Sequence, residues 1–311
     1  MSENTRGETP VFSVSPITLT VPGRPVDLQL RVSAPVTGGD LPIVLLSHGQ
    51  GHSNNLSSLN GYAPLVNFWA AYGFVVIQPT HLSSSTLTLD PNTPGAPMYW
   101  RSRAEDMTHI LDQLDVLESA VPQLSGRLDR GKVAVVGHSM GGHTASVLLG
   151  ARLTVDGTEV NLADPRITAG VLLAAPGRGG DALTEFVAQN YSFFSTTDFA
   201  EMTTPTLIVA GDKDASAHLT VNGPDWHTDP YFLAPGPKSL LTLFDAEHGL
   251  GGISGYDVAE TTDENPARVA AVQRLTWAYL RSEFFPGDPA WRSAQDALAA
   301  GADPLGRVES K

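Results

Sequence analysis

The stretch that decides the fold is KVAVVGHSMGGH, residues 132–143. It begins as a short apolar β-branched run, which predicts a buried strand, and it leads into a small-residue segment, 141–149, which predicts a helix. Gly137 and Gly141 flank Ser139 at two positions before and after it, where a strand that turns sharply into a helix has no room for side chains. This context predicts a strained turn that projects the Ser139 hydroxyl as a nucleophile, with a helix N-terminus beneath it that favours negative charge.

Other apolar runs along the chain predict the rest of a sheet. They end in Gly, Pro, Asp or His and cover residues 43–46, 74–77, 133–136, 171–174, 206–210 and 240–244. Continuous apolar runs fit parallel strands that are buried on both faces, whereas 11–19 and 26–33 alternate in hydrophobicity and predict an antiparallel pair. Amphipathic segments predict helices over 101–117 and 266–284. The fold class is therefore α/β, a mostly parallel central sheet flanked by helices, with antiparallel strands at its N-terminal edge.

Three stretches interrupt the alternation of strands and helices, at 82–100, 177–204 and 216–237. Each follows a predicted strand end, the edge where open α/β sheets build their sites, so we expect these insertions to wall a pocket. The candidates for its lining are Met98, Tyr99, Trp100, Phe193, Phe194 and Leu250.

Length allows one large domain or two small ones, and the spread of the candidate site residues favours one. We expect a flexible N-terminus at 1–10, a single domain at 11–285 and a loosely packed tail at 286–311.

Composition excludes several classes of function. A formal net charge of −14 argues against a nucleic-acid partner, and the absence of cysteine removes disulfides, thiolate nucleophiles and thiolate metal sites. No window approaches about 18 consecutive apolar residues, so no transmembrane segment is expected. Residues 1–10 hold no basic stretch followed by an apolar run, which predicts no secretory signal and a cytoplasmic location, although a trimmed precursor would leave secretion open.

A serine nucleophile needs a base and an acid that orients it. Among nine histidines, His248 follows the last predicted strand directly and is the candidate base, whereas His138 is expected to point away from Ser139 and His81 is a possible pocket residue. Asp214 lies just past another strand end and is the candidate acid. Asp212, which we expect to cap its turn, and Asp245 remain alternatives for the acid.

Two backbone N–H groups are needed to bind the oxyanion that forms on a carbonyl. Met140, the residue after the nucleophile, supplies one. The loop SHGQGH, residues 47–52, follows an earlier strand, and its flanking glycines would let the Gln50 backbone supply the other.

Taken together, the HGQG loop at 48–51, the GHSMGG elbow at 137–142, the GDKD turn at 211–214 and the EHG at 247–249 resemble the α/β-hydrolase fold. They are similar to its chlorophyllase, platelet-activating-factor acetylhydrolase and dienelactone-hydrolase-like branch, with cutinase-like polyester hydrolases second. The likeness covers residues 11–285. It lacks the cysteine pairs of secreted cutinases and a recognisable large helical cap.

This resemblance implies Ser139 as nucleophile, Asp214 and His248 as its partners, and Gln50 and Met140 as oxyanion donors. It also implies a structural pair, Arg103 and Asp106. The expected activity is cleavage of carboxylic esters through an acyl-enzyme, on a small-molecule or lipophilic ester, with no cofactor and no metal.

Other functions stay open at this point. Lactonase, thioesterase, amidase, acyltransferase or polyester hydrolase chemistry would use the same residues. A non-catalytic binding protein of this fold would normally lack one triad member. A metal hydrolase could use Asp212, Asp214 and His218. The glycines at 177–180 do not continue as a dinucleotide-binding G-x-G-x-x-G motif.

Overall fold

A nine-stranded sheet forms the centre of the molecule in a computed structural model of the chain. The structure describes residues 8–56, 58–255, 257–301 and 303–311. The flexible N-terminus expected at 1–10 falls mostly outside these residues, and within them the Thr9 N–H donates to the carbonyl oxygen of Ala71 at 2.9 Å.

The strand order is β1-β2-β4-β3-β5-β8-β9-β10-β11. Neighbours from β4 to β10 run parallel, whereas β1 with β2, β2 with β4, and β10 with β11 pair antiparallel. The strands are β1 (Val11–Leu19), β2 (Leu28–Pro35), β3 (Leu41–Ser47), β4 (Val75–Pro79), β5 (Leu128–His138), β8 (Ile167–Leu173), β9 (Thr206–Gly211), β10 (Lys238–Leu243) and β11 (Gly306–Ser310), with a separate hairpin of β6 (Leu153–Val155) and β7 (Thr158–Val160).

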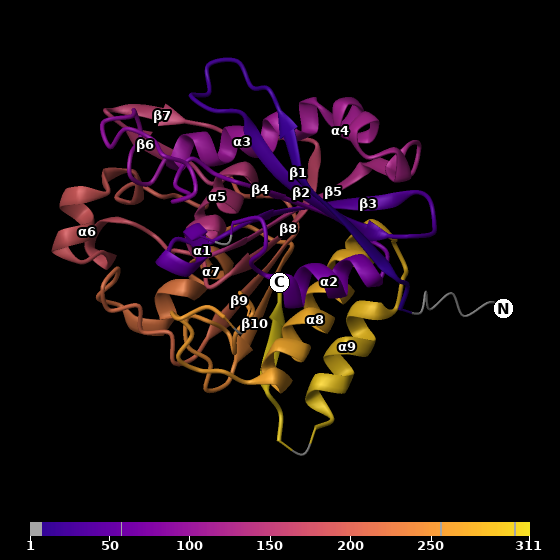
Figure 1. Cartoon of the computed structure of the whole chain (residues 1–311). Helices are drawn as coiled ribbons and strands as arrows, with labels where there is room; N and C mark the ends of the chain where they lie inside the picture. Colours follow the sequence, from indigo (N-terminus) through magenta and orange to yellow (C-terminus); the bar gives the residue numbers. More distant parts are fainter. Residues whose placement is uncertain (1–7, 57, 256, 302) are drawn as a thin grey trace.

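Helices cover both faces of the sheet (Figure 1). On one face the apolar core includes side chains of α2, α8 and α9, and on the other it includes side chains of α3, α4 and α5. The α-helices are α1 (His52–Leu56), α2 (Ala63–Ala71), α3 (Trp100–Asp112), α4 (Leu114–Ala120), α5 (Met140–Leu148), α6 (Glu185–Asn190), α7 (Asp229–Leu233), α8 (Pro266–Phe284) and α9 (Ala290–Ala299).

The sequence pattern explains why the sheet is buried on both sides. In β3, Ile43 and Leu45 join one core while Val44 and Leu46 join the other, so every residue of the run must be apolar. The predicted class, a mostly parallel sheet with flanking helices and antiparallel N-terminal strands, is confirmed and is consistent with the α/β-hydrolase fold. No helix in the described part of the chain is long and apolar enough to span a membrane.

Two expectations from the sequence are wrong. The segment 101–117 is two helices, α3 and α4, because Gln113 leaves helical geometry with φ −116° and ψ 25° while the apolar pattern continues past it. The tail at 286–311 does not pack loosely: α9 lies against α8, and β11 adds an antiparallel edge strand to β10. A five-residue strand with three exposed or half-exposed polar side chains gives little periodic signal, which is why the pattern missed it.

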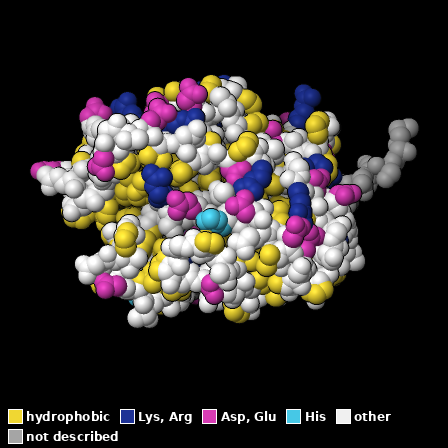
Figure 2. Space-filling model, turned by 90° about the horizontal axis from the view of Figure 1, so that it is seen from above, with side chains coloured by type: hydrophobic (Ala, Val, Ile, Leu, Met, Phe, Trp, Pro, Cys, Tyr) yellow, Lys and Arg dark blue, Asp and Glu magenta, His cyan; other side chains and the backbone are white. Residues whose placement is uncertain are grey.

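Figure 2 shows one face of the surface, on which acidic and basic side chains lie interspersed between areas of hydrophobic ones.

Candidate active site

The turn between β5 and α5 holds Ser139 in a strained backbone conformation, with φ 54° and ψ −121°. Its glycines are required by close backbone approach. A Cβ at Gly137 would lie 1.9 Å from the carbonyl oxygen of Gly141, and one at Gly141 would lie 2.0 Å from that of Ser47. The hydroxyl therefore projects from a rigid turn at the carboxyl edge of the sheet.

A hydrogen-bonded chain joins Ser139 to the two partners expected from the sequence. The His248 Nε2 atom lies 2.8 Å from Ser139 Oγ, and its Nδ1 atom lies 2.7 Å from Asp214 Oδ2. Asp214 is buried, whereas the His248 side chain is 35% exposed. The Nδ1–H of His248 donates to the carboxylate, which leaves Nε2 free to accept the serine proton.

Asp214 sits on the turn that follows β9, and the neighbouring Asp212 has a different task. Asp212 Oδ1 accepts the backbone N–H of Asp245 at 2.7 Å, so it ties this turn to the one after β10, while Ser216 Oγ donates to Asp214 Oδ1 at 2.7 Å. Burial alone would raise the pKa of Asp214, but contacts from two histidines, His227 and His248, outweigh it and hold that pKa well below its ordinary value. The carboxylate of Asp214 is therefore charged at neutral pH.

A second carboxylate fixes the loop that carries His248. Asp263 Oδ2 accepts the backbone N–H groups of Glu247 and Gly251, both at 2.9 Å, and also pairs with Arg268 at 3.1 Å. Because these two N–H groups flank His248, the carboxylate holds the loop on either side of this residue.

The two expected oxyanion donors line the same cavity as Ser139. Met140 is the first residue of α5, where helix geometry leaves the backbone N–H without an intrahelical acceptor. The loop around Gln50 is held on its N-terminal side, since Arg103 donates to the carbonyl of His48 and the Gly49 N–H donates to the Tyr62 hydroxyl at 3.0 Å.

His138 does turn away from Ser139, but it has a structural task that sequence reasoning missed. Its Nε2–H donates to the carbonyl oxygen of His248 at 2.8 Å, and its Nδ1 accepts from the Tyr62 hydroxyl at 2.8 Å. Burial lowers the pKa of His138 to about 3, so the ring is neutral as these hydrogen bonds require. These hydrogen bonds thus link the Gln50 loop to the His248 loop through Tyr62 and His138.

The cavity beside Ser139 has a volume of about 1010 Å³, and all three insertions contribute to its wall. Of the six predicted lining residues, Met98 and Phe194 face it. The other four predicted residues do not line the cavity. Tyr99 is buried at the start of α3, Trp100 stacks on Phe193 behind the wall, and Leu250 lies in the core that covers α8. Further apolar side chains that line the cavity include Pro97, Pro176, Phe186, Val187, Tyr191 and Leu219.

A second hydroxyl–imidazole–carboxylate chain lies deep in the protein. His81 Nε2 is 2.9 Å from Ser47 Oγ and His81 Nδ1 is 2.8 Å from Asp106 Oδ2, with all three residues buried. Asp106 also pairs with Arg24 at 2.9 Å, so Arg103 and Asp106, the pair implied by the resemblance, have different partners. Burial raises the pKa of Asp106 to about 6.

The three residues considered as metal ligands from the sequence, Asp212, Asp214 and His218, are not the three that the structure brings together. In the described residues, the side chains that converge closely enough for an ion are Asp214, His227 and His248, with ligand atoms within 4.8 Å of one another. His227 lies in an insertion rather than at a strand end, so no sequence motif pointed to it.

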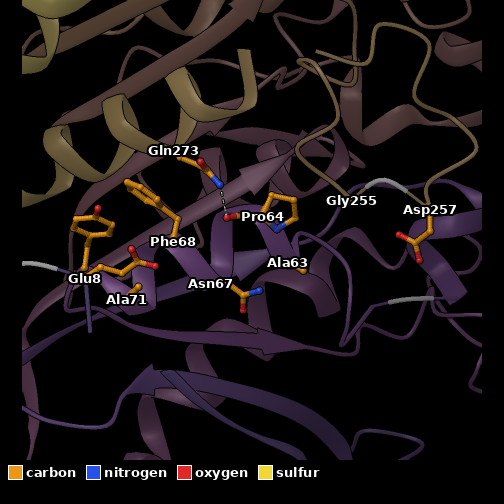
Figure 3. A pocket seen from close by; sticks show the side chains of 10 residues that line it. Glu8, Ala63, Pro64, Asn67, Phe68, Ala71, Gly255, Asp257 and Gln273 are labelled. Carbon is orange, nitrogen blue, oxygen red and sulfur yellow. Dashed lines mark hydrogen bonds between the residues drawn. The ribbon is translucent and has the colours of Figure 1, made fainter. Parts of the chain in front are cut away.

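A further cavity of about 690 Å³ lies between α2 and α8. Figure 3 shows its lining, where Gln273 Nε2 donates to the carbonyl oxygen of Pro64 at 2.7 Å beside Phe68. Among the described residues that line it there is no serine, threonine or histidine, so it offers no nucleophile with a base.

Comparisons with known proteins identify the family of this chain. A family model of chlorophyllases matches residues 6–162, which include the Gln50 loop and the Ser139 elbow, while Asp214 and His248 lie beyond the match. Chlorophyllase-2 of Arabidopsis thaliana is 25% identical over 280 residues, which cover 84% of this chain and 78% of that protein. The family model spans half of the chain, and the chain therefore belongs to the chlorophyllase family.

Proposed function

We propose that this protein is a serine hydrolase that cleaves carboxylic esters through an acyl-enzyme. The observation that carries the proposal is the chain from Ser139 through His248 to Asp214, with distances of 2.8 and 2.7 Å, at the wall of a large apolar cavity. A serine with a base in hydrogen-bond reach, itself oriented by a carboxylate, is the arrangement that activates a hydroxyl for attack on a carbonyl.

In this mechanism His248 Nε2 takes the proton of Ser139 as Oγ attacks the ester carbonyl carbon. The backbone N–H groups of Met140 and Gln50 receive the charge on the carbonyl oxygen. His248 then gives its proton to the leaving alkoxide, and the acyl group stays on Ser139. Water, deprotonated by the same imidazole, attacks the acyl-enzyme, and His248 returns that proton to Ser139 Oγ as the carboxylic acid leaves.

The cavity and the family together support a lipophilic ester as substrate. Apolar side chains such as Met98, Phe186 and Phe194 line a volume of about 1010 Å³, which is large enough for a bulky acyl or alcohol group. A pheophytin-type ester is one such compound.

A substrate panel tests this proposal: p-nitrophenyl esters from acetate to palmitate, lactones, amides and a pheophytin-type ester, with Ser139→Ala as the control. We expect turnover of esters by the wild type and none above background by the variant. Cleavage of amides without any ester turnover, or equal ester turnover by the variant, would contradict the proposal.

A further inference from the structure

A buried serine lies beside the acid of the proposed triad. Ser216 is the first residue of the insertion 216–237, and its Oγ atom lies 2.7 Å from Asp214 Oδ1 and 3.4 Å from His248 Nδ1. It meets the His248 ring at Nδ1, whereas Ser139 meets the same ring at Nε2. Ser216 is therefore placed to act on Ser139 through the two other residues of the triad.

The two oxygens of the Asp214 carboxylate have different partners. Oδ1 accepts from Ser216 Oγ, and Oδ2 accepts from His248 Nδ1 at 2.7 Å. A carboxylate can only accept hydrogen bonds, so the Ser216 hydroxyl is the donor to Oδ1. Rotation of the carboxylate about its Cβ–Cγ bond would break this hydrogen bond. The Ser216 hydroxyl therefore keeps Oδ2 directed at His248.

The backbone of Ser216 indicates that its side chain has a task. Its φ of 38° lies in the left-handed region, which residues with a Cβ atom rarely adopt. Its carbonyl oxygen accepts the N–H groups of Leu219 at 2.7 Å and of Thr220 at 3.2 Å, which forms a turn at the start of the insertion. Glycine would form the same turn without strain, so the turn does not explain the serine, whereas the hydrogen bond to Asp214 does.

We propose that Ser216 is a positioning residue of the hydrolase: its hydroxyl holds one oxygen of Asp214, so that the other oxygen keeps the His248 ring in line with Ser139. The inference rests on the proposed function. Ser216 also borders the cavity, and direct contact with the substrate is therefore the alternative task for its hydroxyl. The two tasks differ in kinetics, because loss of a substrate contact raises KM, whereas loss of positioning lowers kcat.

The test measures kcat and KM for a short p-nitrophenyl ester, together with the melting temperature, in Ser216→Thr, Ser216→Ala and Ser216→Gly. Threonine keeps the hydroxyl, alanine removes it, and glycine removes both the hydroxyl and the Cβ atom. We expect kcat to fall by roughly tenfold to a hundredfold in the alanine and glycine variants, with KM within about twofold of the wild type. The threonine variant should keep kcat within about threefold.

The melting temperatures should follow a different order. The glycine variant should melt above the alanine variant, because both lack the hydroxyl and only glycine adopts a positive φ freely. The threonine variant should melt below the wild type, because a β-branched side chain is strained at this φ. If kcat instead follows the melting temperature, so that glycine is the more active and threonine the less active replacement, the inference is wrong. A raised KM with unchanged kcat would overturn it as well.

Ser239→Ala is the matched control, because Ser239 is another buried serine, whose Oγ lies 2.9 Å from Ser310 Oγ near the start of β10. This variant should lower the melting temperature and leave kcat unchanged. Wild-type kcat in all three Ser216 variants would overturn the inference and leave the proposed function standing. Absence of ester turnover by the wild type would contradict the proposed function itself.

Discussion

The chain that begins at Ser139 and the chain that begins at Ser47 have nearly the same geometry. The serine–histidine and histidine–aspartate distances are 2.8 and 2.7 Å in the first, and 2.9 and 2.8 Å in the second. Their surroundings differ: the His248 side chain is 35% exposed beside a cavity, whereas the His81 side chain is fully buried.

The backbone and the acid also differ between the two chains. Ser139 occupies a strained turn with a helix N-terminus after it, while Ser47 is the last residue of a regular strand. The carboxylate of Asp214 has its pKa held low, whereas burial raises that of Asp106. The comparison teaches that triad distances alone do not identify a site. We propose Ser139 as the nucleophile because it also lies at a cavity, before a helix N-terminus, and in line with a carboxylate whose pKa is held low.

Removal of the Ser139 and Ser47 hydroxyls should give the largest difference between the two chains. Ser139→Ala is expected to lower ester turnover by roughly 10⁴-fold or more. Ser47→Ala should keep turnover within about tenfold but lose about 1–3 kcal/mol of unfolding free energy, because His81 Nε2 loses its buried partner. Steady-state kinetics and urea unfolding measure the two effects. Loss of turnover in the Ser47 variant at unchanged stability would reverse the assignment.

Substitution of Asp214, the proposed acid of the triad, should give the next largest effect. Asp214→Asn should lower kcat by about 10⁴-fold, since an amide N–H toward Nδ1 forces His248 into the wrong tautomer. Asp212→Asn keeps a side-chain oxygen that can accept the Asp245 N–H, so it should cost less than about tenfold. The ratio of the two kcat values is the measurement, and the opposite ranking would make Asp212 the acid.

The raised pKa of Asp106 predicts an unusual pH dependence of protein stability. Its sign is opposite to that for a carboxylate whose pKa is lowered on folding. Its pKa in the folded protein is raised to about 6, above the ordinary value of 3.8, so the folded state binds the proton first as pH falls. The wild type should therefore gain unfolding free energy relative to Asp106→Asn as pH falls from 7 to 4. The gain should be about 2 kcal/mol.

Urea unfolding of both proteins across this pH range isolates the contribution of Asp106. If the difference in unfolding free energy between wild type and variant does not change with pH, or shrinks as pH falls, Asp106 is not a buried carboxyl with a raised pKa.

The link between the Gln50 loop and the His248 loop should give the smallest effect. Tyr62→Phe removes the hydroxyl that accepts from Gly49 and donates to His138. We expect a loss of about 1 kcal/mol of stability and less than about tenfold of kcat, with KM for short esters unchanged. A larger fall in kcat than Asp212→Asn causes would show that the link positions the reacting groups rather than the loops alone.

Much of this fold could be predicted because continuous apolar runs in the sequence indicate the buried strands. The elbow at Ser139 and the strand-end positions of Asp214 and His248 follow from local sequence and from the rule that parallel strands end at one edge. His227 and the chain through Tyr62 could not be predicted, since their contacts depend on how an insertion and a neighbouring loop pack in space. Helix α9 has apolar side chains at helical spacing, Trp291, Ala294 and Leu298, but the Pro, Gly and Asp residues around it suggested a loose tail. Strand β11 is short and mostly polar, so its pattern gave no signal.

The most direct test of the central claim is to locate the adduct that a fluorophosphonate forms on the wild-type protein. Peptide mapping by mass spectrometry should place a single adduct on Ser139, with the peptide that contains Ser47 unmodified. No adduct, or an adduct on any other residue, would contradict the claim that Ser139 is the nucleophile of this protein.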